Sequence, residues 1–416
     1  MPLSVSLITQ ELTLENGLKV IVSEDRRTQS VCTALFHKIG TRHEGPGQQG
    51  LSYLAGGASF KDSAREKHIG AIANGWLEHD FSVYNLTAPP TSTDSVFELL
   101  ARRMAPPVLS PERLNAGLKR DAEIKAAGTN FTSDIWTTEA FRHLISGQTT
   151  APSTADKVAL PPSLNDVMSW HQKGYAPNNS ILVVVGDVSF EEVLPLAQRF
   201  FAEIPRSIET PVAPPILALP DTLERSITEW LDTEQPRLQM AFNTPDLAKI
   251  SDLKHTRCLQ VICALLTLGP DAWLPGRLPE KVRNALDSVY ARPPTFKVGN
   301  NMLLISATAN EHDNDALVRL QSAITHLLDT LKTATLDAAT LEYGRDQAIA
   351  AMQVYDSLEG QGTLIAQFQI IEKPLSLIDR EAQAIRNLSA DDIQQAANSC
   401  FTPKNMSVAY IWPRSA

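Results

Sequence analysis

The chain has few cysteines, and those it has form no recognisable pattern. Four cysteines occur in 416 residues, at positions 32, 258, 263 and 400. No Cys-x-x-Cys pair and no dense spacing is present, which argues against a disulfide framework and against a finger-like zinc site. We therefore expect buried thiols, and the pattern leaves the redox compartment open.

Long apolar runs and an excess of basic charge are also missing. No stretch approaches the roughly 20 apolar residues that cross a bilayer, so we expect no membrane span. The first seven residues lack a basic flank and a long apolar run, so we expect no signal peptide in this chain. The net charge of -10 argues against nucleic acid as a partner, because that partner calls for a basic face.

Common motifs of catalysis are absent as well. The chain contains no Gly-x-Ser-x-Gly elbow and no Gly-Lys-Ser/Thr of a phosphate loop. Its nine histidines include no pair spaced three or four residues apart. Such a pair on one helical face can hold a single zinc ion. A local zinc site is therefore not indicated, and a site assembled from distant residues has no positive signal.

What is present indicates a large globular protein with an internal repeat. Hydrophobic residues make up 43% and charged residues 20%, and 416 residues are too many for one core. Five positions in each half match at one offset of 226 residues: Ser163, Asp166, Val167, Pro177 and Asn179 against Ser389, Asp392, Ile393, Pro403 and Asn405. Each copy is typical of a helix, a proline-marked turn and a buried strand. The repeat predicts two related halves.

Local patterns in the sequence predict both helices and strands. Residues 11–22 alternate apolar and polar side chains around Asn16-Gly17, which predicts a hairpin. Helical periodicity predicts helices at 51–58, 95–104, 111–126, 190–201, 254–268, 314–333 and 337–355. Strand patterns lie at 225–231, 237–242 and 302–309. The prolines of residues 204–220 predict a linker between the halves.

Residues 14–51 carry a family resemblance. They read Leu-Glu-Asn-Gly-Leu-Lys-Val-Ile-Val at 14–22, Lys-Ile-Gly-Thr-Arg-His-Glu-Gly-Pro-Gly at 38–47 and Gly-Leu at 50–51. This segment resembles the pitrilysin-type (M16) zinc peptidases almost position by position. The stretch 50–60 then resembles their active-site helix, but Tyr53, Gly56 and Gly57 stand where the family places His, Glu and His.

These three differences remove the chemistry that the family motif supplies. In His-x-x-Glu-His two imidazoles hold zinc and the Glu activates the bound water. Glycine has no side chain, and a neutral phenol at Tyr53 is a poor zinc ligand. The family takes its third ligand, a Glu, from a later helix, where Ala126 aligns here. Glu123 lies one turn earlier and could mimic it, but we favour a solvated helix residue.

The pair Gly56-Gly57 has two further interpretations. Two glycines cost a helix about 1 kcal/mol each relative to Ala, so they indicate a helix break or a close approach by another backbone. A relic of a lost site is the plainer explanation, and a contact with a partner is the second.

A second resemblance involves Arg283 and Tyr290. The stretch 278–290 is similar to the later Arg/Tyr motif of the family, in which the Tyr follows seven positions after the Arg. In two-chain members one chain carries the zinc motif and the other this pair. The resemblance implies that Arg283 and Tyr290 enter the partner's zinc site and stabilise the oxyanion, since both are donors. Otherwise they would be a surface arginine and a core aromatic.

The resemblance covers most of the chain and implies an α+β fold of two related α/β-sandwich domains. We expect an N-terminal domain at 1–203, the linker at 204–220 and a C-terminal domain with the Arg/Tyr pair at 221–416. The implied function is a non-catalytic subunit of a heterodimeric zinc peptidase that binds peptides or unfolded proteins. The implied partner is a homologous subunit with an intact His-x-x-Glu-His motif, which would hold the zinc; this chain would hold no cofactor.

Two other functions stay open at this point. One is a structural or assembly protein, like the peptidase-like core subunits of the respiratory cytochrome bc1 complex. The other is a peptide-binding accessory factor, for instance in maturation of a ribosomally made cofactor precursor. Exported two-chain relatives favour the periplasm, with the cytoplasm as the alternative.

Overall fold

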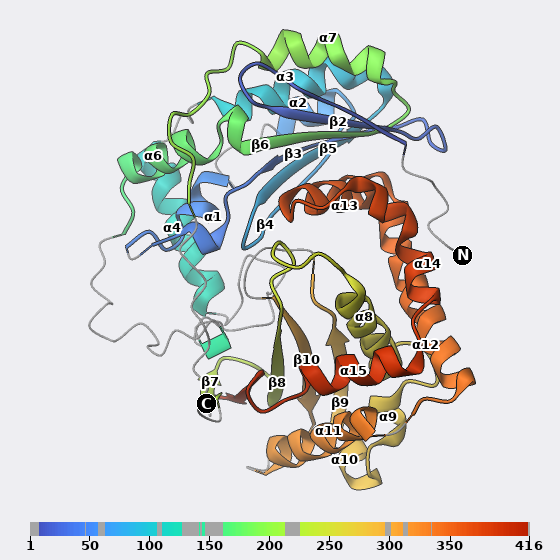
Figure 1. Ribbon diagram of the computed structural model, residues 1–416. Coiled ribbons are helices and arrows are strands. Elements are labelled where there is room, and N and C mark those ends of the chain that lie inside the picture. The colour runs from blue at the N-terminus through green and yellow to red at the C-terminus, as the bar shows by residue number, and fades with distance from the viewer. Residues whose placement is uncertain are drawn as a thin grey trace.

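The computed structural model describes residues 8–45, 47–56, 63–105, 110–126, 141, 144–145, 161–212, 225–295, 301–310, 315–333 and 335–414. Two mixed β-sheets, each accompanied by helices, make up these residues. The first sheet lies in the upper part of Figure 1 and the second in the lower part, with a column of red and orange helices joining them on one side.

The first sheet has the strand order β1-β2-β6-β3-β5-β4. Its strands are β1 (Thr9–Thr13), β2 (Lys19–Glu24), β3 (Val31–His37), β4 (Ile72–Leu77), β5 (Ser82–Ala88) and β6 (Ser180–Gly186). The β2 and β6 strands run parallel, and the other neighbours run antiparallel. The hairpin predicted at Asn16-Gly17 joins β1 to β2, with Gly17 at a φ of 90°. Every residue of β6 and of its neighbour β3 is buried, as expected for the two central strands of the sheet.

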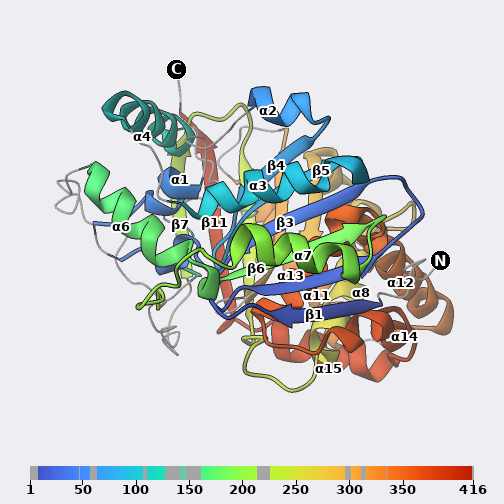
Figure 2. The same cartoon turned by 90° about the horizontal axis from the view of Figure 1, so that it is seen from above.

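Two amphipathic helices cover the outer face of this sheet. They are α3 (Thr93–Met104) and α7 (Phe190–Phe201), which lie side by side over the strands in Figure 2. Phe97 of α3 and Phe201 of α7 are fully buried there, with ring centroids 6.0 Å apart. The remaining elements of this half are η1 (Thr41–His43), α1 (Leu51–Gly56), α2 (Ser63–His68), η3 (Pro90–Ser92), α4 (Pro111–Ala126), α6 (Leu164–Gly174) and η5 (Pro177–Asn179).

The second sheet repeats the topology of the first. Its order is β7-β11-β8-β10-β9, and only the β7 and β11 pair is parallel. The strands are β7 (Arg225–Leu231), β8 (Arg237–Thr244), β9 (Leu286–Arg292), β10 (Asn301–Ala309) and β11 (Met406–Pro413). This is the order and direction of β2-β6-β3-β5-β4. The predicted α+β fold with two related halves is therefore confirmed.

The sequence repeat has a physical explanation in helix capping. The Ser163 hydroxyl accepts a hydrogen bond from the Asp166 amide at the start of α6, and the Ser389 hydroxyl accepts one from the Asp392 amide at the start of α15 (Ala390–Cys400). In both boxes the Asp side chain returns a bond to the Ser amide. The strands that follow, β6 and β11, begin at the same offset of 226 residues.

Most other helices of the second half lie near the second sheet or in the column that joins the two sheets, with one exception. They are α8 (Lys254–Thr267), α9 (Trp273–Arg277), α10 (Glu280–Asn284), α11 (Ala316–Thr333), α12 (Ala338–Ala351), η6 (Met352–Asp356), α13 (Leu358–Ile370), η7 (Leu375–Arg380) and α14 (Glu381–Arg386). The exception is α13, which lies beneath the first sheet in Figure 1. Its apolar side chains belong to the same buried cluster as those of β3 and β6.

One expectation about composition is met in the described residues. All four cysteines are buried and free, as expected from their spacing. None of the described helices has the length and apolar character that a bilayer crossing requires.

Two glycines of α13 provide a matched test of its packing. A Cβ at Gly360 would lie 2.2 Å from the Val354 carbonyl oxygen, whereas one at Gly362 would lie 3.7 Å from Val185 Cγ2. Gly360→Ala should lower the free energy of unfolding by about 2 kcal/mol, because backbone must move. Gly362→Ala should raise it by about 1 kcal/mol through helix propensity. Urea unfolding of both variants measures this, and equal effects would contradict the described seating of α13.

Candidate functional site

Helix α1 carries the positions at which the family motif would lie, and its N-terminus is firmly held. The Glu44 carboxylate accepts hydrogen bonds from the Gly50 amide at 3.0 Å and the Ser52 amide at 2.8 Å. A carboxylate here satisfies free amides of the first turn and suits the helix dipole. At Gly40 a Cβ would meet the Glu78 carbonyl oxygen at 2.3 Å, so only glycine fits where this loop passes the end of β4.

Tyr53 lies half-buried on the apolar side of α1. It packs against a buried cluster whose members are Ile39, Leu51, Leu54, Ala55, Val167, Trp170 and Tyr175. The cluster joins α1 to α6, and Leu114 and Leu118 of α4 pack on it as well. The position of the first family histidine is therefore part of a hydrophobic contact between helices.

Gly56 is the last residue of α1, and the hydroxyl of Tyr175 fills the space beside it. A Cβ at residue 56 would lie 2.5 Å from the Tyr175 hydroxyl oxygen. Tyr175 is buried and the Ser82 hydroxyl donates a hydrogen bond to it at 3.2 Å, so this side chain has little freedom to retreat. The close approach predicted for the glycines is real at Gly56, but a side chain makes it and not a backbone.

The remaining motif positions are only partly visible. Gly57 lies outside the described residues. Ala126 ends α4, and its side chain is not described. Glu123 is exposed and pairs with Arg120 at 3.6 Å, as expected for a solvated helix residue. In the part of the chain that the structure describes, no three His, Cys, Asp or Glu side chains gather where they could hold a metal ion.

A buried ring cluster, consisting of His37, His171 and Tyr175, lies behind α1. The His37 ring centroid is 4.3 Å from that of Tyr175, and the His171 ring stacks on Tyr175 at 4.6 Å. His37 Nδ1 and the Ser180 hydroxyl are 2.7 Å apart, and His171 Nε2 donates to the Arg103 carbonyl oxygen at 2.9 Å. The ring cluster joins β3, α6 and the end of α3 under the helix of the motif.

Burial keeps the ring cluster neutral. Desolvation lowers the pKa of His37 well below its usual value, and His171 adds to this effect. Desolvation also lowers the pKa of His171 to about 4 and raises the pKa of Tyr175. Neutral rings packed in this way suit a structural core. Their sequence positions are 37, 171 and 175, and no spacing rule relates the first to the others.

Glu66 of α2 and Arg103 of α3 connect the ring cluster to the neighbouring helices. The Tyr84 hydroxyl donates a short hydrogen bond to Glu66 of α2. The Arg103 guanidinium carbon lies 3.0 Å from the centroid of the Tyr84 ring, a cation–π contact. Because the Arg103 carbonyl also accepts from His171, α2, α3, β5 and α6 are tied together behind α1. Sequence patterns contain no signal for this network.

Arg283 and Tyr290 lie on consecutive elements at one edge of the second sheet. Arg283 is exposed on α10, and Tyr290 is half-buried on the edge strand β9, opposite Ser306 of β10. Edge strand β9 occupies the place in the second sheet that β4 occupies in the first. The pair is thus presented by the second half, whereas Tyr53 and Gly56 belong to the first.

The contact between residue 56 and Tyr175 gives a double-mutant test. Gly56→Ala alone should lower the free energy of unfolding by about 1–3 kcal/mol, because the new Cβ overlaps the Tyr175 hydroxyl. In a Tyr175→Phe background the nearest atoms are Ser82 Cβ and the ring Cζ, both at 3.6 Å, which is ordinary contact. We expect a coupling of about 1 kcal/mol or more in denaturant unfolding. Additive effects would show that the two sites do not touch.

The neutral histidines predict acid sensitivity. A histidine whose folded pKa is lowered stabilises the fold fully above its unfolded pKa near 6.5 and loses that contribution as the pH falls towards the folded value. For His171, with a folded pKa of about 4, the loss amounts to about 3 kcal/mol between pH 6.5 and 4. Thermal melts across this range should show it. His171→Gln should flatten the profile, whereas a change at the exposed His326 should not.

Comparisons with known proteins agree with the resemblance seen in the sequence. Residues 19–151 match the family model "Insulinase (Peptidase family M16)" and residues 163–348 match "Peptidase M16 inactive domain". Zinc protease PqqE of Helicobacter pylori is 21% identical over 97% of this chain and 93% of its own length. A crystal structure of a protease from Helicobacter pylori superimposes with a TM-score of 0.84 at 20% identity, covering 98% of this chain and all of the other.

A larger solved structure shares the fold over part of its length. The periplasmic protease PqqL from Escherichia coli gives a TM-score of 0.71 at 14% identity over 99% of this chain and 48% of PqqL. At these identities the structures establish the fold. Together the two family models span most of the residues that form both sheets, and the chain therefore belongs to peptidase family M16.

Proposed function

We propose that this chain is a non-catalytic subunit of a heterodimeric M16 zinc peptidase. Its partner would be a homologous subunit with an intact His-x-x-Glu-His motif, which would hold the zinc. This chain would hold no metal itself, supply Arg283 and Tyr290 to the partner's site, and help to bind the substrate.

The observation that carries the proposal is which residues occupy the positions of the zinc motif on α1 and how they are packed. Zinc hydrolysis needs imidazole ligands and a carboxylate that activates the metal-bound water. Tyr53 packs in an apolar cluster, and at Gly56 the Tyr175 hydroxyl takes the space in which a carboxylate side chain would begin. The helix therefore offers neither group at these two positions, while its capping by Glu44 is intact.

The placement of Arg283 and Tyr290 supports a role towards a second chain. An exposed guanidinium on α10 is available to a partner without rearrangement of a core. A guanidinium and a phenolic hydroxyl are donors, and donors aimed at a developing oxyanion stabilise the transition state. We propose that they do this across the interface, in the partner's zinc site.

The substrate would be a peptide or an unfolded protein held by strand addition. The edge strand β4 pairs with β5 on one side, and exposes Ile72 and Asn74. A peptide added to such an edge is read mainly through its backbone, which suits a substrate without fixed sequence. The periplasmic PqqL supports the periplasm as the location, with the cytoplasm as the alternative.

The proposal predicts the effect of two substitutions in the reconstituted pair. Arg283→Ala and Tyr290→Phe should each lower kcat for peptide hydrolysis by about 10²- to 10³-fold, the usual effect of removing one oxyanion donor. Each variant is assayed at saturating peptide with the same zinc-bearing partner. Circular dichroism and the melting temperature establish that the fold is unchanged.

Two control variants lie on the same elements. Lys281→Ala removes a charge from α10, and Ser288→Ala removes a hydroxyl from β9; both residues are exposed. We expect neither to change turnover. If Arg283→Ala and Tyr290→Phe behave like these controls, the catalytic role fails, and a structural, assembly or peptide-binding protein without a catalytic role becomes the better description.

A further inference from the structure

The turn between β4 and β5 is bound to a loop that follows β3. The turn consists of residues 78–81, and we call residues 40–44 the anchor loop. Two backbone amides of the anchor loop donate to two carbonyl oxygens of the turn, each at 3.1 Å: Thr41 to Glu78 and Arg42 to His79. The anchor loop therefore gives the β4–β5 turn a backbone partner where the edge strand ends.

Side chains of the same residues strengthen this contact. Arg42 Nη1 lies 2.8 Å from Oδ1 of Asp80, a residue that is only 4% exposed. Thr41 Oγ1 and His79 Nδ1 are also 2.8 Å apart. A buried carboxylate that loses its cationic partner is costly, so the Arg42–Asp80 ion pair is the strongest candidate for holding the turn in place.

The anchor loop is itself fixed at both ends. At its start, Gly40 packs so closely on the turn that a Cβ would meet the Glu78 carbonyl oxygen at 2.3 Å. At its end, the Glu44 carboxylate accepts the Gly50 and Ser52 amides of α1. The β4–β5 turn is thereby attached to the start of α1, and β4 has a fixed support at its C-terminal end.

Strand β4 needs such a support. It is an edge strand whose strand neighbour in the described residues is β5, and glycine at position 75 weakens a strand from within. The exposed Asn74 amide donates to Glu359 of α13 at 2.8 Å, in competition with water. An exposed edge of this kind belongs to the parts of a fold that open most easily.

A peptide that adds to β4 requires the strand to be in place. The added strand bonds to the backbone of the edge, and the affinity is highest when that edge is already ordered. If β4 were in place only about one-tenth of the time, the apparent Kd of the peptide would rise about tenfold. A residue that holds β4 therefore acts on peptide affinity without touching the peptide.

We propose that Arg42 and Asp80 are positioning residues for peptide binding. Their ion pair holds the β4–β5 turn against the anchor loop and so keeps β4 in the extended conformation to which a peptide strand adds. The anchor loop thus has a use in a chain whose α1 lacks the zinc-binding side chains. The inference rests on the proposed function, because it takes β4 as the edge that receives the peptide.

Hydrogen exchange on the full chain, with and without peptide, tests the inference. The probe is a short synthetic peptide of alternating Val and Ser, blocked at both ends. Arg42→Gln and Asp80→Asn should each speed exchange of the β4 amides about tenfold without peptide. Each should also raise about tenfold the peptide concentration that half-protects β4. Arg42→Lys keeps a charge that can pair with Asp80 and should restore most of both effects.

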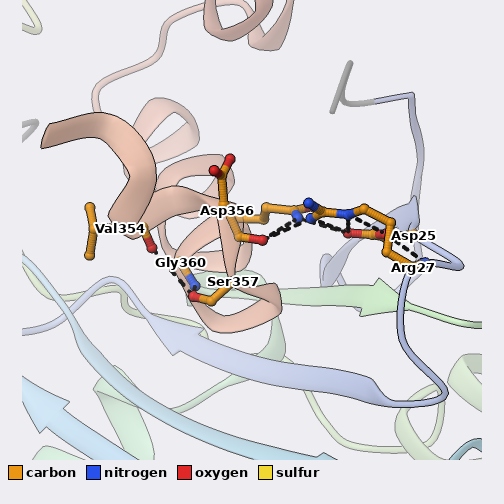
Figure 3. A network of polar contacts seen from close by, with 7 residues as sticks. Asp25, Arg27, Val354, Asp356, Ser357 and Gly360 are labelled. Carbon is orange, nitrogen blue, oxygen red and sulfur yellow. Dashed lines mark hydrogen bonds and ion pairs between the residues drawn. The ribbon is translucent and has the colours of Figure 1, made fainter. Parts of the chain in front are cut away.

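The matched control is Arg27→Gln. Arg27 Nη2 lies 2.7 Å from Oδ2 of Asp25, which is also 4% exposed. Figure 3 shows Arg27 between Asp25 and the Asp356 carbonyl group. Asp25 follows β2, and three strands separate β2 from β4 in the sheet. Loss of this equally buried pair should change exchange and peptide protection of β4 by less than about twofold.

Three results would overturn the inference. They are exchange of β4 that responds equally to Arg42→Gln and Arg27→Gln, faster exchange without a change in the half-protecting concentration, and failure of the peptide to protect β4 in the unaltered chain. If the charge variants do not fold, Thr41→Val removes the contact with His79 and should act in the same direction, about threefold. Neither zinc nor a partner is involved, so this test can fail while Arg283→Ala still lowers kcat, and the reverse.

Discussion

The packing of α13 on the first sheet is the contact on which the rest of the molecule depends. It closes the inner face of the strands that carry His37 and Ser82, and so supports the ring cluster behind α1. Removal would expose a continuous apolar face and leave the Asp25 carboxylate without Gln361. Phe141 of the first half belongs to a buried cluster with residues of the second sheet.

Around α1 the residues that hold the helix are distinct from those at the positions of the zinc motif. Glu44 caps the helix and Gly40 allows the loop to pass the end of β4, so the start of the helix is held in place. Tyr53, Gly56 and Tyr175 then fill the centre with a neutral, tightly packed arrangement. Charge for zinc chemistry is absent from these positions, whereas the Arg283 guanidinium remains exposed at the edge of the second sheet. A neutral α1 together with an exposed Arg283 suits a chain that completes the site of another chain.

Sequence patterns correctly predicted those features that depend on residues close together in the chain. The Asn16-Gly17 turn and the bounds of α4, α7 and β7 follow from residue type and periodicity, and the structure confirms them. Helix α13 was not predicted, because it is apolar on most sides and so lacks the polar stripe that marks a surface helix. The ring cluster was missed for a different reason. Its residues meet only after β3 and α6 pack together, and no spacing in the chain encodes that contact.

The most direct test of the central claim is to purify this chain by affinity from its native cells and to identify, by mass spectrometry, the proteins that accompany it. We expect a stoichiometric second chain of peptidase family M16 with an intact His-x-x-Glu-His motif, and zinc-dependent peptidase activity in the purified complex. Recovery of the chain alone, or with partners that lack the motif, would contradict the role of a non-catalytic subunit in a two-chain peptidase.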